Sequence, residues 1–344
     1  MANPQVTRPG GATALGSGDT LPTLPIEALH KKTGLAEAMR NLCALPDASE
    51  EKEPKCELSF PDDFADGMHG EEASPAKLLA QTATSNAERF VMESGSLKGG
   101  QNVYGHRIGI LMIETHIPRP PGAIGNASSF AFPVLHHVVK GTSGNGTVRD
   151  LGALDAESTE FRQAIEPWID GARYLEHQGC HAITTSCGFS VLFQHHLLEA
   201  VSIPVFSSSL MLIPFIVATL QRERRVGVIT ADAASLSARH LLAAHIDPKR
   251  IHVVGMDGCP EFAATAWDNK TTLDFHRIRN EVVTVAKRLV DEAPDTGALL
   301  LECALLPPYA AAIQAEIDLP VFDFTHLVSL VHNACARNTF SGLI

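Results

Sequence analysis

The sequence lacks a surplus of basic charge. Its 344 residues include 27 Lys and Arg against 39 Asp and Glu, which gives a formal net charge of −12. Proteins that bind nucleic acids or anionic membranes neutralise phosphate groups with clustered Lys and Arg. We therefore expect no nucleic-acid partner and no membrane partner.

Cysteines at paired spacing and long apolar runs are also absent from the sequence. The seven cysteines are odd in number and no two have the C-x-x-C spacing, so neither a disulfide framework nor a zinc knuckle is indicated. No apolar stretch has the length to span a bilayer, and the amino terminus lacks the apolar core of a signal peptide. We expect a reducing, cytoplasmic location. The histidine pairs at 136–137 and 195–196 have no cysteine or carboxylate at ligand spacing, so we expect no metal site.

Residues 1–103 differ in composition from the rest of the chain. Pro, Gly, Ser and Thr dominate the first 25 residues, and a charged run follows at 50–55. Such segments cannot bury enough apolar surface to form a core. We predict an extension that is largely disordered, with candidate short helices at 25–45 and 75–92.

After residue 103, short apolar runs alternate with helix-like segments. The run at 107–113 predicts a buried strand, the run at 132–139 resembles a further strand, and 158–178 has the apolar spacing of an amphipathic helix. The run at 182–186 predicts a further strand, with a helical segment from 189 to 194 after it. Strands that alternate with helices in this way are typical of an α/β fold with a parallel sheet.

Three landmarks of this pattern recur later in the chain. Arg225 follows Arg107 by 118 residues, and Cys303 follows Cys187 by 116. A Pro-Val-Phe triplet at 204–206 also recurs 116 residues later. Landmarks in the same order at nearly one offset predict a duplicated α/β unit. We assign to the first lobe residues 104–222 with the C-terminal segment 320–344, and to the second lobe residues 223–319.

Cys187 and Cys303 both follow apolar strands and precede helical runs, the second of which opens at Pro307. Parallel sheets bind ligands at the carboxyl ends of their strands. Backbone N–H groups and the helix dipole at such a turn favour a thiolate. Two thiols that face a carbon acid would supply the base that removes an α-proton and the acid that returns one. The alternative, a cysteine that only fills the core, we keep for the other five, Cys43, Cys56, Cys180, Cys259 and Cys335.

The two cysteine turns, 184–188 and 302–303, together with the strands at 108–110 and 226–228, resemble the aspartate/glutamate/hydantoin racemase superfamily over about residues 105–335. The resemblance implies two pseudo-symmetric parallel-sheet α/β lobes with the active site in the cleft between them. It also implies no cofactor and one catalytic cysteine from each lobe, Cys187 and Cys303. Arylmalonate decarboxylases of this superfamily keep one of the two cysteines.

Four stretches, 120–126, 186–189, 204–210 and 302–309, are similar to a branch of bacterial racemase-family proteins and algal dimethylsulfoniopropionate lyases. One departure concerns Ala304, because well-studied amino-acid racemases usually have Thr after the second cysteine.

Hydroxyls, turn amides and one guanidinium are candidates to bind a substrate carboxylate. Arg119 and Thr115 belong to a stiff loop with three prolines, and the alternative is that both face solvent. Thr230 ends the equivalent strand of the second lobe, and the nearby Asp232 reads more readily as a helix cap. A glycine-rich segment at 141–147 matches no nucleotide-binding spacing and predicts a flexible loop near the site. The other candidates are Thr184, Thr185, Ser186, Gly188, Ser207, Ser208 and Tyr309.

We predict a cofactor-independent racemase or epimerase of a small carboxylate of the acidic amino acid type. The alternative is dimethylsulfoniopropionate lyase-type C–S elimination by the same thiolate base. A sulfonium substrate prefers aromatic surroundings, for which Phe130, Phe132, Phe189 and Tyr309 are candidates in a chain with only two Trp. A further alternative is a non-catalytic binding protein on a racemase fold. The expected partner is a small-molecule carboxylate, and homo-oligomer formation is left open.

Overall fold

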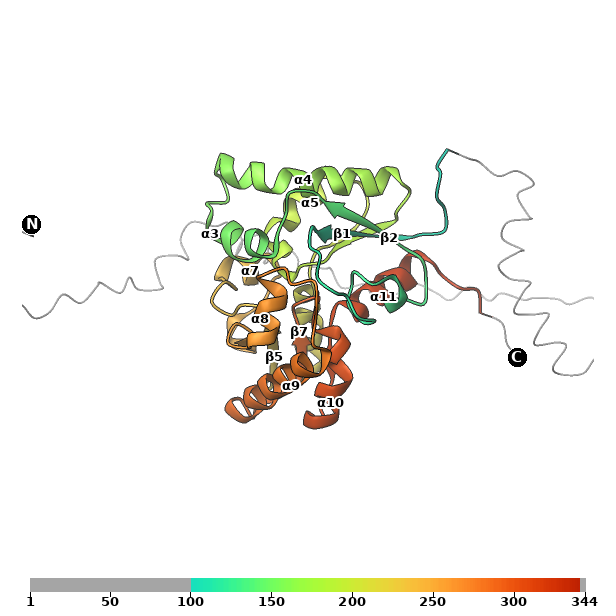
Figure 1. The fold of residues 1–344 in the computed structure, drawn as a ribbon. Coiled ribbons are helices and arrows are strands. Elements are labelled where there is room, and N and C mark those ends of the chain that lie inside the picture. Colours follow the sequence, from blue (N-terminus) through green and yellow to red (C-terminus); the bar gives the residue numbers. More distant parts are fainter. Residues whose placement is uncertain (1–99, 341–344) are drawn as a thin grey trace, which may run out of the picture. The chain divides into compact units, whose positions relative to one another are not determined.

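The computed structural model describes residues 100–340, which form two lobes built around separate four-stranded sheets (Figure 1). Most of the predicted extension, including the candidate helices at 25–45 and 75–92, lies outside the described residues.

The first sheet has the strand order β2-β1-β3-β4, and all its strands are parallel. Its strands are β1 (Ile108–Ile113), β2 (Val134–Val139), β3 (Ala182–Thr185) and β4 (Val205–Phe206). Every residue of β1 and β3 is buried, as the continuous apolar runs predict for strands covered on both faces.

Helix α4 (Thr159–His177) covers one face of this sheet. Ser158 caps its amino terminus by accepting the N–H of Phe161, and Trp168 lies among the buried side chains of its inner face. The predicted helix at 158–178 is therefore confirmed, because the apolar residues repeat at the helical period.

The second sheet repeats the first, with the order β6-β5-β7-β8 and parallel strands. Its strands are β5 (Arg225–Thr230), β6 (Ile251–Gly255), β7 (Thr296–Leu301) and β8 (Val321–Phe322). The register repeats as well, since Ile183 pairs with Val205 in the first sheet and Leu299 with Val321 in the second. The duplicated α/β fold predicted from the offsets is confirmed.

Helix α9 (Phe275–Glu292) packs on the second sheet together with α10 (Ala310–Ile317). The predicted helical segment after Cys187 begins as a 3-10 helix, η4, and continues as an α-helix, α5. The shorter helical elements are η2 (Ala127–Ser129), η3 (Gly146–Asp150), α3 (Leu151–Ala153), η4 (Gly188–Phe193), α5 (Gln194–Ala200), η5 (Ser209–Leu212), α6 (Ile213–Thr219), α7 (Ala238–Ala243), η6 (Pro248–Arg250), α8 (Pro260–Ala266), η7 (Pro307–Tyr309) and α11 (Phe324–Cys335).

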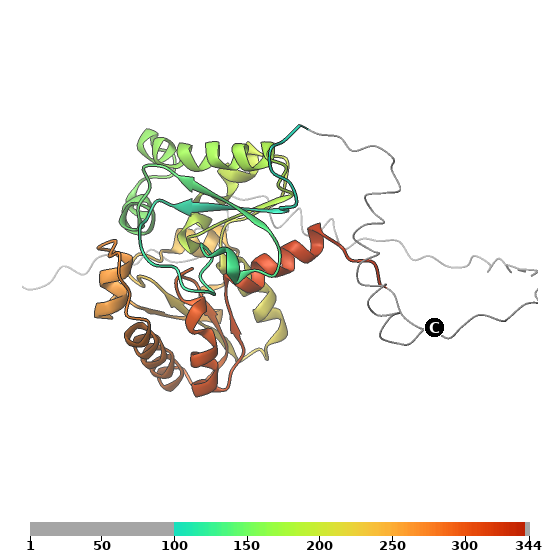
Figure 2. The ribbon, with the colours of Figure 1, turned by 45° about the vertical axis from the view of Figure 1, so that its right-hand side comes forward.

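The two lobes exchange one helical segment each. After β4, the chain crosses so that η5 contacts β7 and α6 contacts β5 of the second sheet. After β8, α11 returns to contact β1 and β3 of the first sheet, and it lies at the boundary of the lobes in Figure 2. The C-terminal segment that we assigned to the first lobe is thus divided, because Val321–Phe322 pair with β7 while α11 covers the first sheet.

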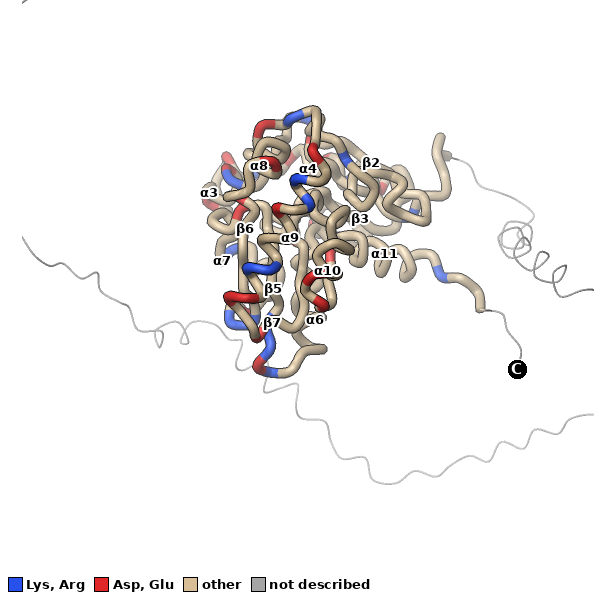
Figure 3. Tube along the Cα trace, turned by 60° about the horizontal axis from the view of Figure 1, so that its bottom comes forward, with Lys and Arg blue, Asp and Glu red and all other residues tan. Residues whose placement is uncertain are grey.

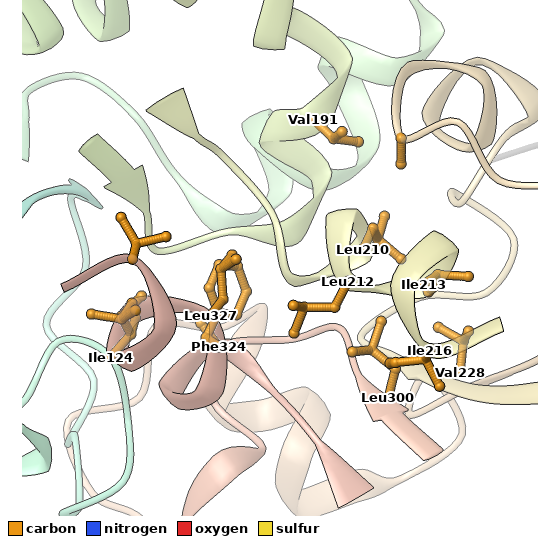
Figure 4. Close-up of a cluster of buried hydrophobic side chains, with 14 of the residues drawn as sticks. Ile124, Val191, Leu210, Leu212, Ile213, Ile216, Val228, Leu300, Phe324 and Leu327 are labelled. Carbon is orange, nitrogen blue, oxygen red and sulfur yellow. The ribbon is translucent and has the colours of Figure 1, made fainter. Parts of the chain in front are cut away.

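A hydrophobic cluster joins the lobes where these segments cross (Figure 4). Leu210 and Ile216 of the first exchanged segment meet Val228 and Leu300 of the second sheet in this cluster, and Phe324 of α11 belongs to it too. Full burial of one such side chain is worth about 1.5–3 kcal/mol. The cluster therefore holds the strand ends of the two sheets in a fixed relation.

Charged residues are scattered over the described elements. Figure 3 shows basic and acidic positions interspersed along the helices and strand ends, with no continuous track of one sign in that view of residues 100–340. None of the helices in this part of the chain combines the length and apolar character that crossing a bilayer requires.

Candidate active site

Cys187 and Cys303 line one pocket at the carboxyl ends of β3 and β7. Cys187 occupies the cap position of η4 in an extended conformation and is 6% exposed. Cys303 follows β7 by two residues and is partly buried. The lining residues are Ile113, Thr115, Ile117, Arg119, Gly144, Val148, Ser186, Cys187, Gly188, Phe189, Ala231, Ala266, Trp267, Glu302, Cys303, Ala304 and Leu305.

The pocket is small. Its cavity volume is about 50 Å³, and about 10–15 Å³ measured in this way is enough for one water molecule. Space on this scale suits a ligand of a few heavy atoms.

The hydroxyl groups around Cys187 hold the turn in place. The Thr185 hydroxyl accepts the Cys187 N–H at 3.2 Å and donates toward the carbonyl of Ser207, 2.7 Å away. The Thr184 hydroxyl donates to the carbonyl of Phe206 at 2.6 Å. Two buried hydroxyls thus bind backbone groups of neighbouring segments, which fixes the position of the cysteine.

The structure brings some of the predicted substrate-binding residues to the pocket and not others. Thr115, Arg119, Ser186 and Gly188 line it. The Ser186 hydroxyl also accepts the Ile113 N–H at 2.9 Å.

The remaining candidates do not line the pocket. Ser207 and Ser208 are fully buried, and the Ser208 hydroxyl caps η5 by accepting the N–H of Leu210. Tyr309 is buried in the second lobe, with its ring centroid 4.8 Å from that of Phe275. The lining does not include Thr184, Thr185, Ser207, Ser208, Thr230 or Tyr309.

Arg119 is the cation of the pocket wall. Its Nη2 donates to the Thr115 hydroxyl at 2.7 Å. Burial lowers the pKa of the guanidinium, and the nearby Cys303 sulfur acts in the opposite direction. The absence of a side chain at Gly125 leaves space for the Arg119 side chain, because a Cβ there would lie 2.7 Å from Arg119 Nε. The loop with three prolines therefore holds its arginine toward Cys303.

Glu302 is a buried acid in the same wall, 1% exposed. Its Oε2 accepts the Thr230 hydroxyl at 2.7 Å, while its Oε1 has no hydrogen-bond partner among the described residues. The carboxyl lies directly against Gly188, where an added Cβ would overlap Oε1. Burial raises the pKa of Glu302 to about 7, although the Thr230 hydroxyl and the Ala231 N–H act to lower it.

The thiols differ from the sequence-based expectation of a favoured thiolate. The N–H groups of Phe189 and Ser190 do lower the pKa of Cys187, as expected at a helix start. Burial and the neighbouring Glu302 carboxylate outweigh them and hold the Cys187 pKa well above its ordinary value. The same two causes raise the pKa of Cys303 to about 12. Both thiols therefore keep their protons at neutral pH in this arrangement.

Some residues of the second lobe line the pocket although no sequence motif marks them. Trp267 follows α8, and the guanidinium carbon of Arg149 lies 4.1 Å from its ring centroid. Arg149 Nε also donates to Asp232 Oδ2 at 2.8 Å. The Asp232 Oδ1 accepts the N–H groups of Ala234 and Ser235. Asp232 thus stabilises a turn and ties the lobes together. Its reading as a helix cap was wrong, because α7 begins at Ala238 and its cap is Ser237.

The glycine-rich segment 141–147 lies at the rim of the pocket. Gly144 lines it, and a Cβ on Gly144 would come within 2.9 Å of the Ala266 carbonyl. Asn145 Nδ2 donates to the Trp267 carbonyl at 3.2 Å. The segment is placed near the site as predicted, and its flexibility stays a prediction.

Two aromatic side chains line the pocket, Phe189 and Trp267. Phe130 and Phe132 lie elsewhere, with ring centroids 5.7 Å apart, and Phe132 stacks on His332. Among residues 100–340, no group of three or more His, Cys, Asp or Glu is arranged to hold a metal ion.

Comparison with known proteins shows which proteins this chain is similar to. The Asp/Glu/Hydantoin racemase family model matches residues 150–328. A dimethylsulfoniopropionate lyase from Durusdinium sp. clade D is 30% identical over 228 residues, 64% of this chain and 72% of that protein. Dimethylsulfoniopropionate lyase 7 from Emiliania huxleyi is 32% identical over 226 residues, 63% of each chain. A solved glutamate racemase from Bacillus anthracis is 16% identical with a TM-score of 0.46, covering 68% of this chain and 85% of that one.

Proposed function

The chain belongs to the Asp/Glu/Hydantoin racemase family, and from that premise we propose that it cleaves the carbon–sulfur bond of a small sulfonium carboxylate of the dimethylsulfoniopropionate type. The curated relatives described above are named for this reaction, which favours elimination over the racemisation that we predicted first from the sequence. The observation that carries the proposal is a partly buried arginine that lines one small pocket together with the Cys303 thiol.

Arg119 is the anchor for the substrate carboxylate. Paired N–H donors of a guanidinium bind a carboxylate in a fixed plane. Because the Cys303 sulfur lies near enough to Arg119 to act on its pKa, we place the α-carbon of a carboxylate bound to Arg119 next to that sulfur. We therefore assign Cys303 as the base, with Thr115 holding the guanidinium in place.

The reaction balances as an elimination. The Cys303 thiolate takes the proton from the carbon next to the carboxylate, and the electron pair of that C–H bond becomes the new double bond. The bond between the β-carbon and the sulfonium sulfur breaks, and its electrons stay on sulfur. The products are dimethyl sulfide, acrylate and a protonated Cys303.

The sulfonium end of the substrate needs surroundings that tolerate a cation without hydrating it. Aromatic faces attract cations of this kind, and Phe189 and Trp267 present aromatic carbons to the pocket. They support the lyase reading more directly than Phe130, Phe132 or Tyr309, which do not line the pocket.

Headspace gas chromatography tests this proposal. Freshly reduced protein given dimethylsulfoniopropionate should release dimethyl sulfide. Cys303→Ala should lower the rate by roughly a hundredfold or more, the range of general base catalysis. Cys187→Ala should keep a measurable rate, because elimination needs one base. Cys259→Ala is the matched control, since that thiol lies outside the pocket. Absence of gas from the wild-type protein would refute the lyase proposal.

A second candidate is the racemase or epimerase predicted from the sequence, and the presence of both thiols in one pocket favours it. Inversion needs a base on one face of the carbon and an acid on the other. In D₂O a racemase would place deuterium at the α-carbon of an acidic amino acid and scramble its chirality. Either Cys187→Ala or Cys303→Ala would then abolish inversion, which separates this mechanism from the one-base elimination.

A further inference from the structure

Glu302 is an unusual residue for this pocket. A buried carboxyl normally has hydrogen bonds to all its lone pairs or a cationic partner, because the charged form is costly away from water. The Glu302 side chain is 1% exposed. The Thr230 hydroxyl donates to its Oε2, and the Ala231 N–H also acts to lower its pKa, but neither is a cation. The free Oε1 rests against Gly188, the residue directly after Cys187.

The carboxyl acts on both thiols at once. Glu302 precedes Cys303 in the chain, and its charge also raises the pKa of Cys187 from the other lobe. Gly188 permits this approach, because any side chain there would collide with Oε1. Glu302, Cys187, Cys303 and Arg119 are the titratable and charged groups that line the pocket. Asp232, in the loop after β5, is already paired with Arg149.

The chemistry of the site requires a proton acceptor other than the substrate. If the proposed elimination holds, each turnover leaves one proton on the Cys303 thiol and a thiolate must be formed again. Burial keeps that proton on sulfur at neutral pH. Arg119 cannot accept a proton, and the Thr230 hydroxyl is a far weaker acceptor than a carboxylate.

We propose that Glu302 is the proton acceptor of the two thiols, taking the proton of Cys303 on its free Oε1 and releasing it through the pocket that both residues line. The step balances, since Cys303–SH and the Glu302 carboxylate become the Cys303 thiolate and a neutral carboxylic acid. The same exchange would generate a thiolate at Cys187. Glu302 acts through the sulfurs and is therefore a positioning and proton-transfer residue.

The pH dependence follows from the sign of the Glu302 shift. Below pH about 7 the carboxyl keeps its own proton and cannot accept another. Turnover should therefore fall as the pH falls through this value. Without the carboxyl, this limb of the pH profile should disappear.

Glu302→Gln tests the proposal with two measurements. The first is the rate of iodoacetamide alkylation at Cys187 and Cys303 against pH, read from the labelled peptides by mass spectrometry. Removal of the negative charge should speed both reactions, roughly tenfold for each unit by which a thiol pKa falls. Cys259 is an internal control, because its pKa is raised by burial and by Glu281 rather than by Glu302.

The second measurement is turnover of dimethylsulfoniopropionate. It should fall roughly a hundredfold in Glu302→Gln although its thiols react faster, a split that a purely structural role would not produce. Glu302→Asp keeps a carboxyl group and should retain a pH-dependent rate of turnover. This variant tests the proposal if Glu302→Gln does not fold. Wild-type turnover in Glu302→Gln, or unchanged alkylation of both thiols, would overturn the proposal. If the wild-type protein has no lyase activity, the alkylation profiles still decide whether Glu302 controls the thiols.

Discussion

Glu302 should make the folded protein less stable as the pH rises from 5 to 8. In the folded chain burial raises its pKa from the ordinary value of 4.5 to about 7. Between these two values the unfolded chain has lost the proton that the folded chain still holds. Stability falls with pH wherever the folded state binds more protons than the unfolded state. The penalty is therefore absent below pH about 4.5 and complete above pH about 7.

The size of this penalty follows from the same two values. A difference of one pKa unit corresponds to about 1.36 kcal/mol. A rise from 4.5 to about 7 therefore costs about 3 kcal/mol of unfolding free energy at pH 8. Glu302→Gln keeps the shape and the acceptor for Thr230 but removes the titration. Relative to wild type it should gain about 2.5 kcal/mol between pH 5 and pH 8, because a small part of the penalty is already present at pH 5.

Urea unfolding of the full chain at pH 5, 6, 7 and 8 measures this difference directly. The matched control is Glu316→Gln in the same lobe, where the Lys287 ammonium lowers the pKa of the carboxyl. Glu316 is ionised in both states over this range, so its difference from wild type should be flat. A flat difference for Glu302→Gln as well would show that the carboxyl is not buried as described, and the reasoning would fail.

Three further changes test other parts of the structure. Gly125→Ala places a Cβ against Arg119 and should raise KM for a carboxylate substrate more than it lowers kcat in steady-state kinetics; an unchanged KM would contradict the role of the arginine. Thr230→Val removes the hydroxyl that donates to Glu302. Because a hydrogen bond to a charged group is worth about 1.5–3 kcal/mol, the pH at which the Glu302 carboxyl loses its proton in the folded protein should rise by about one unit. An unchanged pH dependence of the unfolding free energy would count against the contact. Trp168→Ala removes the largest fully buried side chain among the described residues. It should lower the unfolding free energy by about 3–5 kcal/mol in urea titrations. A loss below about 1 kcal/mol would mean that the core beneath helix α4 is not packed as described.

Much of the fold could be predicted because it follows from local patterns. Strands β1 and β3 are continuous apolar runs, and helix α4 has a cap at Ser158 and apolar residues at the helical period. The repeated landmarks also predicted the second sheet, since equivalent residues pair in the same register. The exchange of α6 and α11 between lobes cannot be predicted from such patterns, because the sheet on which each helix packs depends on contacts between segments far apart in the chain.

The site was predictable in part for the same reason. Cys187 and Cys303 follow equivalent strands of the two sheets. The carboxyl ends of parallel strands lie at the same edge of a sheet, and both cysteines line the pocket there. Trp267 was harder to find. Trp267 comes from the end of α8, where no motif marks it, and it reaches the pocket through contacts with Asn145 and Arg149 of the other lobe.

The sequence by itself determined that two cysteines stand at matching positions of a duplicated α/β unit, because strands, turns and repeats are written in local order along the chain. Only the tertiary structure decided the charge of the site. It buries both thiols against Glu302 and sets Arg119 beside Cys303. A pKa depends on desolvation and on distances through space, and neither quantity can be read from positions along a sequence.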